Sequence, residues 1–73
     1  LKSVSIISKD GTLADALSTS LFIMGEEKAI GYWKENGSNF DILLMTNDNR
    51  LIVSAGIKDK VISDNYKIEV INK

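Results

Sequence analysis

The sequence predicts an α+β fold in which two consecutive helices pack on a largely antiparallel sheet, in the order β-α-α-β-β-β. Alternating apolar and polar residues at positions 3–8 indicate a half-buried strand. Two amphipathic stretches, residues 12–24 and 26–35, follow directly. Two apolar runs, residues 40–46 and 51–57, then flank polar turn residues 47–50, as in a β-hairpin, and the alternating residues 66–71 indicate a last strand.

Length and composition exclude several classes of protein. The chain has 73 residues, which allow one domain at most. It contains no Cys and no His, so it can hold neither a disulfide nor a histidine metal ligand, and any metal would be a hard cation bound by oxygen. Nine basic residues against ten acidic ones give a net charge of −1, so the composition shows no excess of positive charge for binding nucleic acid. The longest apolar runs are far too short to span a membrane.

The first helix is contained in the stretch "GTLADALSTSLFIMG", residues 11–25. Thr12 is a suitable N-cap, and Asp15 follows three residues later as in a capping box. Gly25 is expected to end the helix. Apolar residues occupy more of the surface than a single stripe, so we expect the helix to be buried on more than one side. The stripe itself comprises Leu13, Leu17, Leu21 and Met24, widened by Ala14, Ala16, Phe22 and Ile23.

The second helix is expected to begin at two acidic residues, 26 and 27, that favour the positive end of its dipole. Asn36 and Gly37 should end it. Gly31 lies in its middle, which costs about 1 kcal/mol relative to Ala, and we expect that glycine to permit close packing. The inner stripe comprises Ala29, Ile30 and Trp33.

Asp15 and Thr19 share a face of the first helix because they are four residues apart. One interpretation is structural: Asp15 supports the helix start and the Thr19 hydroxyl bonds back to the carbonyl of residue 15. The other is functional: a carboxylate and a hydroxyl one turn apart can bind one side of Mg²⁺, whose remaining positions water and phosphate oxygens fill. The residues alone favour the structural interpretation.

Weaker candidates lie elsewhere. Trp33 and Tyr32 are expected to be a core anchor and its edge rather than a stacking platform. Residues 54–56, Ser-Ala-Gly, could allow a close approach of the backbone, although a glycine at a strand end is more often a bulge or turn.

The run from Ala14 to Gly25 resembles a motif of ApbE-type flavin transferases (FAD:protein FMN transferases), A-D-A-x-x-T-A-x-F-x-[ML]-G, with Ser20 where Ala is usual. The strand "SVSIIS", residues 3–8, precedes it where the family typically shows a strand of the type V-x-V-x-A. Residues 26–33 look like the family's "PEKGLEL" helix, and residues 40–57 like its "EALLIDKDGKIYVSKGF" hairpin, with Asn49 at a position where a turn glycine is usual. The resemblance covers residues 3–57.

The resemblance implies that Asp15 and Thr19 are ligands of Mg²⁺, which contacts the pyrophosphate of FAD. It also implies the reaction, transfer of FMN from FAD to a Thr hydroxyl of an acceptor flavoprotein with release of AMP. FAD would then be the substrate and Mg²⁺ the cofactor. This reverses the preference for the structural interpretation of the pair.

The family's His-containing H-x-x-x-P-x-T-G segment would end where residue 1 begins, and most of the flavin pocket would belong to an N-terminal part. Residues 1–73 are therefore expected to be the C-terminal segment of such a transferase, inactive alone and prone to self-association through an exposed apolar face. By resemblance, the whole protein would be a lipid-anchored protein outside the cytoplasmic membrane. The alternative is a stand-alone, non-catalytic binding or assembly module on the same scaffold.

Overall fold

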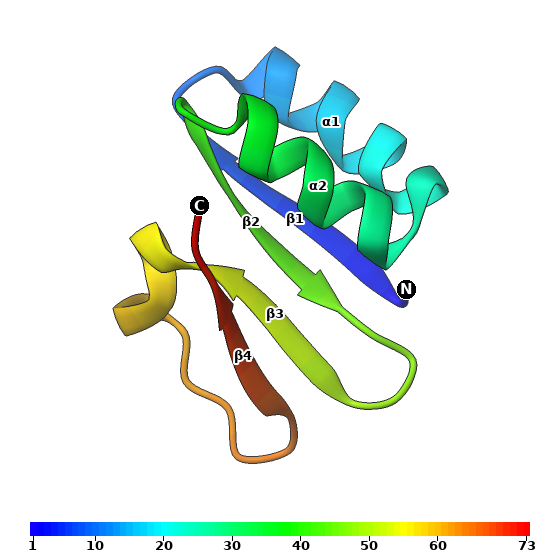
Figure 1. Ribbon diagram of the computed structural model, residues 1–73, viewed down its shortest axis with the longest axis vertical. Helices are drawn as coiled ribbons and strands as arrows, with labels where there is room; N and C mark the ends of the chain where they lie inside the picture. Colours follow the sequence, from blue (N-terminus) through cyan, green and yellow to red (C-terminus); the bar gives the residue numbers. More distant parts are fainter.

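The computed structural model describes all residues, 1–73, and has the predicted α+β architecture. Two helices lie side by side across one face of a four-stranded sheet (Figure 1). The elements in chain order are β1 (Ser3–Ser8), α1 (Gly11–Met24), α2 (Glu26–Asn36), β2 (Phe40–Met45), β3 (Arg50–Ser54), the 3₁₀ helix η1 (Ala55–Lys60) and β4 (Lys67–Ile71).

The sheet has the strand order β1-β2-β3-β4, and its two edges are β1 and β4. Strand β2 pairs antiparallel with β1 and with β3, whereas β4 runs parallel to β3. The connection through η1 carries the chain back to the start of β3, where the Lys67 N–H donates to the Asn49 carbonyl over 3.0 Å. The sheet is thus largely antiparallel, as predicted, with one parallel edge pair.

The main core lies between the helices and the sheet. Trp33 is its anchor, as predicted: its side chain is buried, and its indole Nε1 donates to the Phe40 carbonyl over 3.0 Å. Tyr32 lies at the edge of this core, half-buried, with its ring tilted against that of Phe40. The buried members of the core are Leu17, Leu21, Ala29, Trp33, Phe40, Ile42, Leu44 and Ile52.

Helix α1 begins earlier than predicted, and the capping box centred on Thr12 is wrong. Asp10 is the N-cap: it has extended backbone angles, and its carboxylate Oδ1 accepts from the Leu13 N–H over 3.0 Å. Gly11 is already the first helical residue. Asp15 therefore lies beyond the first turn. The C-terminal end is as predicted, because Gly25 takes a positive φ of 85° that favours glycine.

Only one side of α1 is covered in this chain, so the expectation of burial on more than one side is wrong. Leu17 and Leu21 face the sheet, whereas Phe22 and Ile23 are 47% and 79% exposed. Gly31 of α2 is also exposed, and nothing lies within 4 Å of the position that a Cβ would occupy. The expected close packing at Gly31 is therefore not observed.

The hairpin turn lies at residues 47–49, and Arg50 already opens β3. Asn49 has a φ of 65°, so it takes the left-handed geometry that a turn glycine would otherwise supply. Strand β3 ends at Ser54, three residues earlier than the apolar run had indicated, since Ala55 begins η1. The apolar residue of that stretch, Ile57, is buried by η1 instead of by a strand.

Strand β3 is buried on both faces. Ile52 points to the helices, while Leu51 and Val53 point to the other face, where η1 and its buried Ile57 lie near the sheet. Neither α1 nor α2 has the length and apolar character that crossing a lipid bilayer would require.

Candidate functional site

Asp15 and Thr19 both lie on the exposed side of α1, one helical turn apart. The Asp15 carboxylate makes no hydrogen bond and no ion pair within the chain. Because Asp10 caps the helix, Asp15 has no part in capping it. The predicted role of this carboxylate at the helix start is therefore wrong.

The backbone carbonyl of Asp15 accepts from two side chains. Ser18 Oγ donates to it over 2.9 Å, and Thr19 Oγ1 donates over the longer distance of 3.5 Å, which confirms the bond that the structural interpretation of Thr19 predicted. Bonds of this kind are common for Ser and Thr within helices. A hydroxyl that donates its proton to a carbonyl keeps its lone pairs as acceptors, so the Thr19 oxygen remains able to bind a cation.

The donor set suits a hard cation that brings most of its own ligands. Asp15 and Thr19 offer a carboxylate and a hydroxyl, the oxygen ligands that Mg²⁺ takes. No group of three or more Asp, Glu, His or Cys side chains in the chain is placed to hold a metal. The two residues would therefore complete the octahedron only with water, phosphate or oxygens from another part of a longer protein.

A shallow groove separates α1 from the outer edge of β1, and we call it the α1–β1 groove. It is lined by Ser18, Thr19, Phe22 and Ile23 of α1 and by residues 2–4 at the start of the chain. The ammonium of Lys2 is directed to Tyr66, with 3.4 Å to its hydroxyl and 5.5 Å to the centre of its ring. Thr19 thus lies at a polar point in a groove that becomes apolar toward the end of the helix.

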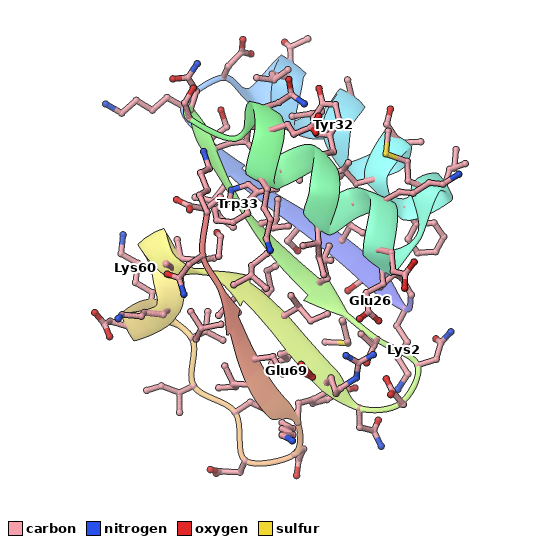
Figure 2. The ribbon with its side chains drawn as sticks, viewed as in Figure 1. Lys2, Glu26, Tyr32, Trp33, Lys60 and Glu69 are labelled. Carbon is pink, nitrogen blue, oxygen red and sulfur yellow. The ribbon has the colours of Figure 1, made fainter.

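Sequence reasoning missed an ion-pair network around Arg50. Its guanidinium contacts Glu26 at the start of α2 over 2.7 Å, Glu69 on β4 over 3.1 Å and Asp48 in the turn over 3.0 Å. Figure 2 shows Glu26 and Glu69 coming from the helix and the last strand to this point. Glu26 and Glu69 lie 24 and 19 positions from Arg50, so no local sequence pattern reveals these contacts. The sequence shows only that acidic residues outnumber basic ones.

The network shifts two pKa values. Hydrogen bonds from the Thr46 hydroxyl and the Arg50 guanidinium hold the pKa of Asp48 below its usual value of 3.8. Hydrogen bonds to Glu26 and Asp48 raise the pKa of Arg50, so its charge is permanent. The network connects helix α2, the hairpin turn and the edge strand β4.

The Ser-Ala-Gly stretch does make a close approach. The buried Ser54 hydroxyl donates to Asp41 Oδ1 over 2.8 Å and accepts from the Ile42 N–H over 2.9 Å. A Cβ on Gly56 would lie 2.7 Å from the same Asp41 oxygen. A side chain at position 56 would therefore require the Asp41 carboxylate to shift, and Gly56 also lies in the turn that follows β3, so both interpretations of this stretch describe it.

Comparison with known proteins relates the sequence of this chain to flavin transferases. The model of the ApbE family matches residues 1–44, which is more than half of the chain. A protein named FAD:protein FMN transferase from Treponema pallidum (strain Nichols) is 42% identical over 59 residues. The chain belongs to the ApbE family. No solved structure matches it significantly.

The alignment with the Treponema protein covers 81% of this chain but only 16% of the relative. The chain therefore spans a small part of the polypeptide that carries the relative's name. Residues 14–25, which include Asp15 and Thr19, fall within the part that the family model matches.

Proposed function

We propose that this chain provides the metal-binding segment of a Mg²⁺-dependent FAD:protein FMN transferase, with Asp15 and Thr19 as protein ligands of the ion. Family membership and the name of the relative support the reaction class. The single observation that carries the metal role is the Asp15 carboxylate, which is exposed, unpaired and free of any capping role, one turn from the Thr19 hydroxyl.

Electrostatics explain why such a pair would need a cation. FAD carries a pyrophosphate, and a lone carboxylate would repel it. Bound at Asp15 and Thr19, Mg²⁺ would neutralise charge on the phosphoryl oxygens as the group is transferred. Asp15 would provide the charge that holds the ion, and Thr19 a neutral oxygen that orients it. Helix α1 fixes both oxygens on one face.

The proposed reaction breaks the pyrophosphate bond of FAD and forms a bond between the FMN phosphorus and a Thr oxygen of the acceptor protein. AMP leaves, and the proton of the Thr hydroxyl must pass to a base. The chain has no His. The Asp15 carboxylate is assigned to the metal, so we assign the base to another part of the polypeptide. Residues 1–73 alone are therefore expected to be inactive.

A chimeric enzyme tests the proposal. The Treponema transferase would carry this chain in place of its matching segment, and FMN transfer from FAD to an acceptor protein would be followed by flavin fluorescence on the denatured acceptor. The chimera should transfer FMN only with Mg²⁺ present. The 73-residue chain alone should transfer none. Transfer by a chimera with both Asp15→Asn and Thr19→Val at the normal rate would refute the metal role.

A further inference from the structure

Strand β1 is an open edge of the sheet. It pairs only with β2, and the other side of its backbone has no partner strand. Unpaired N–H and C=O groups along an edge are a template for another strand. Among the side chains of β1, from Ser3 to Ser8, none is charged and none is proline, so the edge carries none of the usual features that prevent pairing.

The apolar end of α1 lies beside this edge. Phe22 and Ile23 line the α1–β1 groove together with residues 2–4. They are 47% and 79% exposed, whereas Leu21 of the same helix is fully buried. An open strand edge next to an exposed apolar helix face offers both backbone pairing and side-chain packing, which a polypeptide can satisfy and a small ligand cannot.

We propose that the α1–β1 groove is the surface on which the rest of an ApbE polypeptide packs, with an extended segment added to β1 and apolar side chains covering Phe22 and Ile23. The length of the relative argues for this occupant, because the matching segment makes up 16% of it and the remainder must contact that segment somewhere. Thr19 lines the same groove. A segment seated there would thus lie close to the Asp15–Thr19 pair, which lacks further ligands in this chain.

The proposal rests on family membership and on the surface of the chain, and it does not depend on metal binding. Two exposed isoleucines provide a matched test. Ile23 is in the groove and 79% exposed, and Ile62 lies in the loop after η1 and is 90% exposed. Substitution of either by Gln removes the same apolar side chain.

The first experiment measures the melting temperature of the Treponema chimera and of the isolated 73-residue chain. Ile23→Gln should lower the melting temperature of the chimera by several degrees, because it places a polar side chain where the packed segment would bury an apolar one. Ile62→Gln should leave it unchanged. In the isolated chain, neither variant should shift it. Equal melting temperatures of the two chimera variants would overturn the proposal.

The second experiment measures association and needs no chimera. The 73-residue chain would be mixed with the Treponema transferase lacking its matching segment, and binding followed by sedimentation velocity. Binding that Ile23→Gln weakens and Ile62→Gln does not is the expected result. A chain that instead forms a dimer sensitive to Ile23→Gln, with no binding to the truncated transferase, would assign the groove to a second copy and overturn the proposal. Neither experiment uses FMN transfer, so a failed metal role would not affect the outcome.

Discussion

The Thr19 hydroxyl oxygen lies 3.5 Å from the carbonyl oxygen of Asp15, while the Asp15 carboxylate has no partner in the chain. The backbone of Asp15 is thus engaged by its neighbours and its charge is left free. A charged group without a structural partner on a helix surface is tolerated at little cost, so its removal should barely change stability.

The first prediction separates the two aspartates near the start of α1. Asp10→Ala should destabilise the isolated chain by about 1 kcal/mol, because it removes the N-cap bond to Leu13. This loss corresponds to about 4–8 °C in melting temperature for a domain of this size. Asp15→Ala should leave the melting temperature within about 2 °C of the parent. Thermal unfolding followed by circular dichroism measures both melting temperatures. A larger loss in Asp15→Ala than in Asp10→Ala would show that Asp15 caps the helix.

The second prediction concerns Gly31, within helix α2, and Gly37, at the end of that helix. Gly31→Ala should stabilise the isolated chain by about 0.5–1 kcal/mol, since a Cβ there meets open space and alanine favours the helix. Gly37→Ala should destabilise it by about 1–3 kcal/mol, because its Cβ would overlap the indole ring and the carbonyl oxygen of Trp33. Urea unfolding gives both values. A destabilising Gly31→Ala would show that this face of α2 is packed in solution.

The third prediction follows from the lowered pKa of Asp48. The folded chain binds a proton at Asp48 less readily than the unfolded chain, so this group stabilises the fold above about pH 4, the unfolded value. That contribution should disappear as the pH falls through the lower folded pKa. Asp48→Asn should flatten the fall of the free energy of unfolding between about pH 5 and pH 2. The effect should be small and should shrink with added salt, because the Asp48 side chain is 66% exposed. Identical acid profiles for the variant and the parent would contradict it.

Much of the fold followed from local pattern. The spacing of Leu17 and Leu21 predicted the helix, and the polar residues 47–50 between two apolar runs predicted the turn. The end of β3 did not follow: Ser54 is its last residue and bonds to Asp41, thirteen residues away, and a contact at that separation has no local sequence pattern. The parallel pairing of β4 likewise depends on the path of the connection between β3 and β4. The sequence of that connection does not specify whether β4 runs parallel or antiparallel to β3.

The candidate site was predictable only in part. The spacing of Asp15 and Thr19 showed that they share a helix face, and the family motif indicated why. The pattern placed the helix start at Thr12, whereas the structure places the cap at Asp10. Either residue is an acceptable cap by propensity. Only the three-dimensional position of the Asp10 carboxylate decides between them, and with Asp10 as the cap the Asp15 carboxylate has no capping role.

The fourth prediction concerns Mg²⁺ binding by the isolated chain. Only two protein oxygens are available, so binding should be weak and confined to α1. In a titration followed by amide NMR, shifts should concentrate near Asp15 and Thr19. They should vanish in Asp15→Asn and persist in Asp59→Asn, since Asp59 is an exposed aspartate of η1 outside the proposed site. Shifts centred on Glu26 and Glu69 instead would place the cation at the Arg50 network.

The central claim is that Asp15 holds a catalytic cation, and the most direct measurement is the rate of FMN transfer by the Treponema chimera carrying Asp15→Asn. We predict a fall of about 10²-fold or more, since metal stabilisation of the transferred group is worth several kcal/mol and each 1.36 kcal/mol is a factor of ten. The melting temperature should be unchanged, and Asp59→Asn should transfer FMN at the parental rate. A chimera with Asp15→Asn that transfers FMN at the parental rate would contradict the account.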